Sequence, residues 1–151
     1  MKLFKQTPGI WQYVLNPTEV EILINLIKQF PDTELGWVKI SNTDEDPQAA
    51  EREKLLNESL AEHRQELEKQ SLNLFVGKFE PQGKAKLLTL NAEEREILLQ
   101  ILNGIRVGCW IALGKPETTE PPTHGSSALE FARYGLMNLA GYFEHHLIAQ
   151  D

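Results

Sequence analysis

The sequence predicts a mainly helical α+β domain, with four to five helices and a small antiparallel β-sheet. Three observations lead to this prediction. Apolar residues recur at helical spacing through most of the chain, two asparagines stand three positions before a glutamate at expected helix starts, and short strand-like segments occur near both of them. A length of 151 residues is enough for a substantial core, so we expect a single domain over residues 1–151.

The sheet is expected to begin with an N-terminal hairpin, KLFKQTPGIWQYVL, at residues 2–15. Pro8 presets φ at the first central position of a turn and Gly9 accepts a positive φ at the second. A third strand, AKLLTL at residues 85–90, is expected to complete the sheet, because a lone hairpin is only marginally stable in water. Residues 77–84 contain two glycines and a proline and are predicted as a turn.

Capping residues and helix breakers predict the helices. They are expected, in chain order, over residues 17–30, 47–75 and 91–113, and from a cap at Ser126 or Ser127 to about residue 148. The second has a candidate break at Asn57, which would divide it in two, and its inner stripe is expected to include Leu56, Leu67 and Leu74. Residues 31–47 are expected to form a connector that leads into it.

The charge of the chain is negative and unevenly distributed. The formal net charge is −7, and residues 16–70 hold 13 acidic and 6 basic residues, whereas the remainder is balanced. A solvated acidic helix face accounts for this pattern. Because an acidic segment repels phosphate backbones, direct binding of nucleic acid is disfavoured.

Composition also limits the cellular setting. Residues 1–5 lead into no apolar segment of the kind found in signal peptides, and no stretch reaches the roughly 18 consecutive apolar residues of a membrane span. We therefore expect a cytoplasmic protein that does not enter a membrane. The single cysteine, Cys109, excludes an intramolecular disulfide and a cysteine-based zinc cluster, and its apolar surroundings favour a small core residue over a reactive thiol.

One arginine interrupts the apolar segment LNGIRVGCWIALG at residues 102–114. Arg106 lies on or at the edge of the expected buried stripe, with Asn103 one turn earlier. A buried guanidinium needs a carboxylate or several carbonyl acceptors, because desolvating it unpaired is costly. The pattern favours a structural clamp to another helix, through an acidic side chain or a helix C-terminus. The alternatives are a binding site for an anion or carboxylate at Arg106 and Asn103, and simple exposure.

Other patterns that could support chemistry are weak. The adjacent His145 and His146 point about 100° apart on a helix and cannot both face one ion. His63 and Glu66 can share a face, but two ligands make a poor metal site. Zinc-protease, di-iron and nucleotide-binding motifs are missing from the sequence. We therefore expect no metal, no cofactor, no catalytic residues and no enzymatic activity.

The last helix has an unusually wide apolar band. Its members are Leu129, Ala132, Leu136, Leu139, Ala140, Phe143 and Leu147. So wide a band is typical of a central helix or of one that also meets a partner, and it makes a homodimer through this helix one expected arrangement. The helix expected over residues 91–113 contains Gly104 and Gly108, four positions apart. We expect these glycines to let another helix pack closely against it.

The order of the segments resembles a bacterial family of small proteins, frequent in actinobacteria, that is known as a domain of unknown function. The specific core of the resemblance is Leu102, Asn103, Arg106, Leu113 and Gly114, together with Ala128-Leu129. Members are often encoded beside the ClpS-type protease adaptor, and some are regarded as oxidative-stress transcriptional regulators. The resemblance implies a regulatory or adaptor role, but no cysteine-pair redox switch, because Cys109 has no second cysteine beside it.

These observations predict a non-enzymatic cytoplasmic module with a regulatory or protein-interaction role and a protein partner. The partner surface is expected on the terminal helix or on the acidic face of residues 44–70. One alternative is a protein, or an unrecognised enzyme, that binds a small anionic molecule at Arg106. A transcriptional regulator is the third alternative; it rests on the resemblance, and the acidic balance of the chain opposes it.

Overall fold

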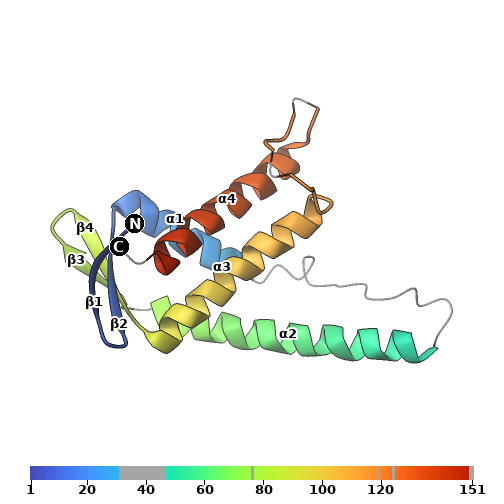
Figure 1. The fold of residues 1–151 in the computed structure, drawn as a ribbon, viewed down its shortest axis with the longest axis horizontal. Coiled ribbons are helices and arrows are strands. Elements are labelled where there is room, and N and C mark those ends of the chain that lie inside the picture. The colour runs from blue at the N-terminus through green and yellow to red at the C-terminus, as the bar shows by residue number, and fades with distance from the viewer. Residues whose placement is uncertain (31–46, 76, 119, 124, 150–151) are drawn as a thin grey trace.

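The computed structural model describes residues 1–151 apart from 31–46, 76, 119, 124 and 150–151 (Figure 1). The elements in chain order are β1 (Lys2–Thr7), β2 (Ile10–Leu15), α1 (Pro17–Gln29), α2 (Pro47–Phe75), β3 (Phe79–Gln82), β4 (Ala85–Asn91), α3 (Ala92–Ala112) and α4 (Ala128–Ile148). The described residues therefore form the mainly helical α+β fold that the sequence predicts. The predicted connector over residues 31–47 lies almost entirely outside them.

The sheet has four antiparallel strands in the order β1-β2-β4-β3. Gly9 has a φ of 77° between β1 and β2, as the predicted turn requires. β4 pairs along the whole of β2, with Tyr13 opposite Leu88, which confirms the third strand predicted beside the hairpin. Tyr13 and Leu88 are both fully buried, so the centre of the sheet contributes directly to the core.

The prediction of a turn over residues 77–84 is wrong for most of that segment. Residues 79–82 form β3, which pairs with β4 from Phe79 opposite Leu88 to Gln82 opposite Ala85. β3 is an edge strand, and an edge strand tolerates Pro81 because the missing N–H belongs to the unpaired side of the sheet. Turns remain at Gly77, which has a φ of 77°, and at the link between β3 and β4, where Gly83 has a φ of 62°.

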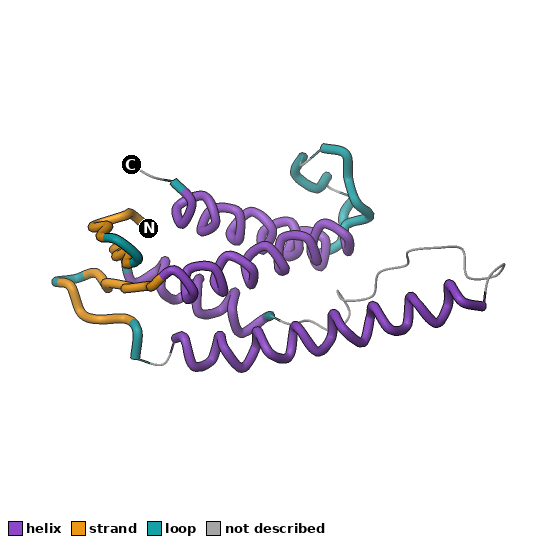
Figure 2. Tube along the Cα trace, turned by 60° about the horizontal axis from the view of Figure 1, so that its bottom comes forward, coloured by secondary structure: helices purple, strands orange, loops and turns teal. Residues whose placement is uncertain are grey.

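The core lies between the sheet and the helices α1, α3 and α4, which pack against one another (Figure 2). Capping boxes at Asn16 and Asn91 begin α1 and α3, as the sequence predicts, and Ser127 caps α4. α3 is the central helix, with its apolar face buried. The buried core residues from α3 and α4 are Leu98, Ile101, Leu102, Ile105, Cys109, Met137, Ala140, Phe143 and Leu147.

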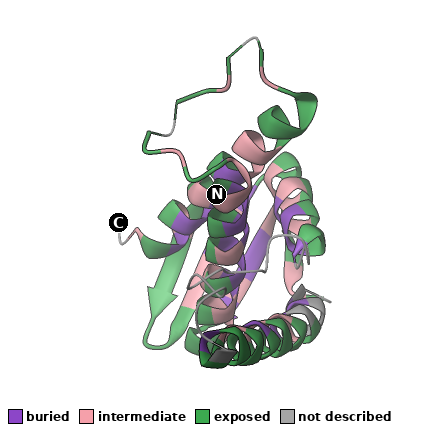
Figure 3. Cartoon of the chain, turned by 90° about the vertical axis from the view of Figure 1, so that its right-hand side faces the viewer, coloured by how far each residue is buried: buried purple, intermediate pink, exposed green. Residues whose placement is uncertain are grey.

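α2 is one continuous helix of 29 residues, so the predicted break at Asn57 is wrong. Asn57 is buried inside the helix, and its tertiary surroundings override its preference for a cap position. Leu67 and Leu74 pack into the core as predicted, but Leu56 is 40% exposed. Seen end-on, α2 presents mostly exposed residues (Figure 3). The α2 residues that belong to the main apolar core, Leu67 and Leu74, therefore lie in its C-terminal half.

Candidate functional site

The two arginines of α3 that face α4 are Arg95 and Arg106, which are 11 residues, or about three turns, apart on the same face. α3 and α4 form the most extensive contact between elements of the described chain. Both arginines donate hydrogen bonds across this contact, Arg95 to Leu147 and Arg106 to Glu144. The two arginines are therefore the candidate site residues.

Arg95 binds the C-terminal end of α4. Its Nε donates a hydrogen bond of 3.0 Å to the carbonyl oxygen of Leu147, and its Nη2 contacts the same oxygen. A carbonyl in the last turn of a helix has no partner within the helix, and a cation there complements the helix dipole. Arg95 also donates to the hydroxyl of Tyr13 at 3.3 Å, and its guanidinium lies 4.8 Å from the centre of the Trp11 ring.

The hydroxyl of Tyr13 is part of this cluster and donates a hydrogen bond of 3.2 Å to the carbonyl oxygen of Leu147. Burial raises the pKa of Tyr13, because it disfavours the phenolate, while the hydrogen bond and the charge of Arg95 act in the opposite direction. The neutral hydroxyl can therefore serve as a donor over a wide pH range. The cluster connects β2, α3 and α4.

Arg106 contacts Glu144 on α4. Its Nη1 donates a hydrogen bond of 2.7 Å to Oε2 of Glu144, which forms an ion pair between the two helices. The side chain of Glu144 is 10% exposed, whereas that of Arg106 is 50% exposed. The acidic partner expected for a structural clamp is therefore Glu144, and Arg106 lies at the edge of the buried face.

The ion pair does not satisfy either side chain fully. Oε1 of Glu144 is buried without a hydrogen-bond partner. Nε and Nη2 of Arg106 have no hydrogen-bond partner within the described residues. Gly141 on α4 lies next to the side chain of Arg106. A Cβ atom added to Gly141 would be 3.6 Å from both Cδ and Nε of Arg106. The small residue on α4 thus lets the arginine cross the interface and reach Glu144.

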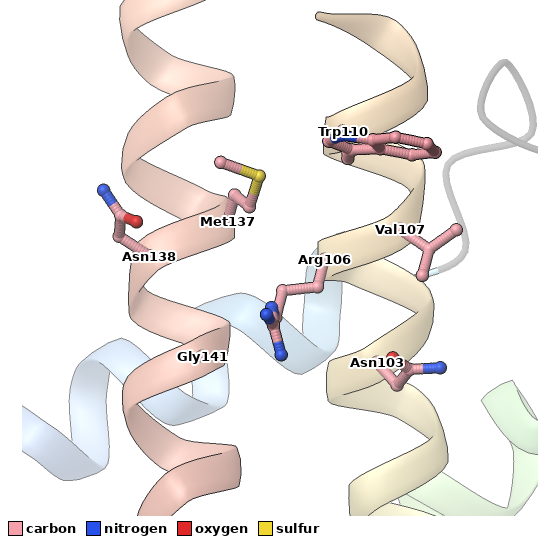
Figure 4. A pocket seen from close by; sticks show the side chains of 7 residues that line it. All are labelled: Asn103, Arg106, Val107, Trp110, Met137, Asn138 and Gly141. Carbon is pink, nitrogen blue, oxygen red and sulfur yellow. The ribbon is translucent and has the colours of Figure 1, made fainter. Parts of the chain in front are cut away.

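A groove of about 600 Å³ opens beside Arg106 between the two helices. Its lining residues are Asn103, Arg106, Val107 and Trp110 from α3 and Met137, Asn138 and Gly141 from α4 (Figure 4). Arg106 and Met137 point into the space between the helices, toward each other's helix (Figure 4). Arg106 is the only charged residue of this lining set, so the groove combines one cation with two amides and an apolar wall.

The indole of Trp110 has a defined position at the end of the groove. Its Nε1 donates a hydrogen bond of 3.0 Å to the carbonyl oxygen of Pro116, in the loop after α3. This bond uses the polar atom of the ring, so the rest of the indole contributes apolar surface; Trp110 as a whole is 37% exposed.

The structure places both predicted binding residues, Arg106 and Asn103, on this groove. Sequence reasoning did not identify Glu144 or Arg95. A signal for Glu144 exists, because it follows Met137 and Gly141 at helical spacing and is therefore an acidic residue on the apolar side of α4. A signal for the role of Arg95 is missing, since its main acceptor is a backbone carbonyl of α4.

The remaining predicted positions have structural surroundings. Cys109 is buried in the core, as expected. A Cβ on Gly104 would lie 2.8 Å from Cε2 of Phe30, so this glycine permits the close approach of the end of α1. In the described part of the chain no three His, Cys, Asp or Glu residues are placed to hold a metal ion. Among the described helices, none has the length and apolar character needed to cross a membrane.

Comparison with known proteins found no matching family model, curated protein or solved structure. The resemblance to the actinobacterial family therefore stays a prediction.

Proposed function

We propose that the protein is a non-enzymatic regulatory or protein-interaction module that binds a segment of its partner in the groove between α3 and α4. The observation that carries the proposal is the exposed guanidinium of Arg106, held by Glu144 beside an apolar wall. A cation with unused donors next to apolar surface is typical of recognition sites, where charge selects the partner and apolar contact supplies affinity. The regulatory part of the proposal rests on the family resemblance.

The lining residues favour binding over catalysis. A general base or nucleophile needs a titratable or nucleophilic group beside the reacting atom. The groove is lined by amide, apolar and guanidinium side chains, and the carboxylate nearest to it, Glu144, is buried under its pair with Arg106. The groove therefore supplies hydrogen-bond donors and apolar contact to a ligand, which is the chemistry of recognition.

Photo-crosslinking at the groove tests the proposal. A photoreactive amino acid replaces Asn138, which lines the groove, and in a matched variant it replaces the exposed Glu130 on the same helix. We expect adducts with a specific protein from a lysate of the source organism at position 138 and not at 130. The Gly141→Leu substitution, which fills the groove, is expected to abolish the adduct. Equal capture at both positions, or capture that persists with Leu at position 141, would contradict the proposal.

A second candidate function is the binding of a small anionic molecule at the same place. The volume of the groove, about 600 Å³, lies within the roughly 300–1,000 Å³ typical of small-molecule sites. In this case the photoreactive group at position 138 gives no protein adduct. A small carboxylic acid then raises the thermal stability of the wild type. It fails to stabilise a variant in which Arg106 and Glu144 are both replaced by glutamine.

The outer face of α4 is a separate contact surface, for which we propose a second copy of the chain. Phe131, Leu139 and Tyr142 share this face and are 46%, 37% and 40% exposed. The charged residues of α4 lie elsewhere on the helix. Beside this face the Glu19 carboxylate accepts from the hydroxyl of Tyr142 and is paired with the Met1 ammonium, so the two charges there offset each other. We expect a dimer in sedimentation experiments and a monomer for Leu139→Glu. Leu55→Glu, at an exposed leucine of α2, is the matched control and is expected to remain dimeric.

A further inference from the structure

The groove matches a ligand with a single negative charge. Arg106 is the one charged side chain among its lining residues. The chain as a whole carries −7, and the field of that charge disfavours ligands with several acidic groups. One carboxylate on an otherwise uncharged segment satisfies both conditions.

The atoms of Arg106 that remain available are arranged for a carboxylate. Nη1 is used by Glu144, and this bond fixes the orientation of the guanidinium before any ligand arrives. Nε and Nη2, which have no partner in the described part of the chain, are neighbouring donors on one edge of the planar group. Two parallel N–H groups of this kind match the two oxygens of a carboxylate, and such paired bonds are stronger and more selective than single ones.

The walls beside the arginine match an apolar side chain. Val107 and Trp110 are 43% and 37% exposed, and Met137 adds a polarisable side chain from α4. Asn103 and Asn138, on opposite helices, supply amide donors and acceptors of the kind that recognise a peptide backbone. At the end of a protein chain the carboxylate is attached directly to the residue that carries the last side chain, so charge and apolar group lie side by side. An internal Asp or Glu carries its carboxylate at the tip of a polar side chain.

We infer that the groove binds the free carboxyl end of a partner protein whose last residue is apolar, with the carboxylate on Nε and Nη2 of Arg106 and the last side chain against Val107, Trp110 and Met137. This inference rests on the proposed function and specifies the chemistry of the partner.

Short peptides test the inference by isothermal titration calorimetry on the full chain. The probes are acetylated tetrapeptides that end in Leu, Phe, Lys or Glu, each prepared as the free acid and as the C-terminal amide. We expect the Leu and Phe acids to bind about tenfold or more tightly than their amides, because the amide loses the charge-assisted pair. The Lys and Glu acids are expected to bind more weakly than either.

Substitutions locate the binding and separate it from folding. Arg106→Gln alone leaves Glu144 buried without its cation, so the informative variant is Arg106→Gln with Glu144→Gln, which keeps two amides in contact and removes both charges. It is expected to fold and to lose the preference for the acid over the amide. Arg133→Gln, on the same helix α4 and outside the groove lining, is the matched control and is expected to retain that preference.

The remaining outcomes overturn the inference in distinguishable ways. Equal binding of acid and amide, or a preference for the peptide that ends in Glu, shows that the partner is recognised by other chemistry. If photo-crosslinking at position 138 succeeds in that case, the interaction module stands and only the carboxyl-end inference fails. If benzoate or isovalerate binds as tightly as the best peptide, the ligand is a free organic acid and not the end of a protein chain. This result would support the second candidate function instead.

Discussion

Arg95 and Arg106 extend from the same face of α3 to α4, but the fold uses them differently. Arg95 gives its donors to the carbonyl oxygen of Leu147 and the hydroxyl of Tyr13, and its flat face covers Trp11. Arg106 makes one hydrogen bond, to Glu144, and half of its side chain is exposed. An arginine on an apolar helix is therefore not in itself a functional signal; the exposure of the guanidinium beside an open groove is what distinguishes the candidate site at Arg106 from the clamp at Arg95.

The difference follows from the acceptors that α4 offers. At its C-terminal end α4 has backbone carbonyls without helical partners, and a cation satisfies them while it complements the helix dipole. One turn before that end, at Glu144, the backbone of α4 is already hydrogen-bonded, so the acceptor must be a side chain, and Glu144 supplies it. Gly141 clears the path for Arg106 and at the same time leaves the groove open.

Removing the Arg95 cluster has the largest expected effect on stability. Arg95→Met keeps much of the apolar length of the side chain and removes every donor. The carbonyl of Leu147 then depends on Tyr13 alone, and the end of α4 loses its cation. We expect the free energy of unfolding to fall by about 2–3 kcal/mol, as measured by urea denaturation. A loss below about 0.5 kcal/mol would show that water replaces the hydrogen bonds of Arg95. Arg95 would then contribute no more to stability than an exposed arginine, and the contrast with Arg106 would not hold.

Replacing one partner of the Arg106–Glu144 pair is expected to lower the free energy of unfolding more than replacing both. Arg106→Gln alone should cost about 2 kcal/mol, because a buried carboxylate is left without its cation. The double variant with Glu144→Gln should cost about 1 kcal/mol or less, since exchanging a pair for two amides removes the charges together. A double-mutant cycle measured by urea unfolding gives the coupling energy. If the single and double variants are equally unstable, the pair contributes no coupling and Arg106 is held by its apolar contacts.

Features that local chemistry determines were predictable from the sequence. The capping boxes at Asn16 and Asn91, the turn at Gly9 and the strand after residue 85 depend on neighbours a few positions away, and the structure confirms them. The edge strand β3 was missed, because Pro81 is a breaker in a central strand and acceptable only at an edge, and the position of a strand within a sheet is a non-local property.

The site itself was predictable in kind and not in detail. The position of Arg106 on its helix showed that a guanidinium at this edge needs an acceptor, whereas the identity of Glu144, 38 residues away, depends on how α3 and α4 are aligned. Arg95 shows the limit more clearly. Its partners Tyr13 and Leu147 are 82 and 52 residues distant, and one of them acts through its backbone, which no side-chain pattern reveals.

Gly104 of α3 packs against Phe30 at the end of α1, close to Arg106. Gly104→Ala places a methyl group 2.8 Å from the buried ring of Phe30, and the resulting displacement should exceed the helix propensity that alanine gains. We expect a net loss of about 1 kcal/mol in the free energy of unfolding. Gly135→Ala on α4 is the matched control, because nothing lies within 4 Å of its added Cβ, and it should stabilise the protein by about 0.5 kcal/mol. Equal effects of the two substitutions would show that Phe30 moves aside at no cost.

The smallest expected effect is the pH dependence at the start of α3, beside Arg95. Partial burial of Glu94 opposes its ionisation, but the hydrogen bond from Lys78, the backbone amide of Asn91 and the charge of Lys78 outweigh it and lower the pKa of Glu94 below its ordinary value. Because the folded state holds the carboxylate ionised at a pH where the unfolded state protonates it, this contribution to stability is present at neutral pH. It is lost as the pH falls from the ordinary pKa of a glutamate through the lowered pKa of Glu94.

Glu94→Gln should therefore lose less stability than the wild type as the pH falls below the ordinary pKa of a glutamate, as measured by urea unfolding at a series of acidic pH values. Glu93→Gln, at an exposed residue of the same first turn, is the matched control and should follow the wild-type curve. If Glu94→Gln also follows that curve, the Lys78 pair does not persist in solution. The N-terminal end of α3 is then held to the fold by the Arg95 cluster, which would make the contrast between the two arginines larger than the structure alone indicates.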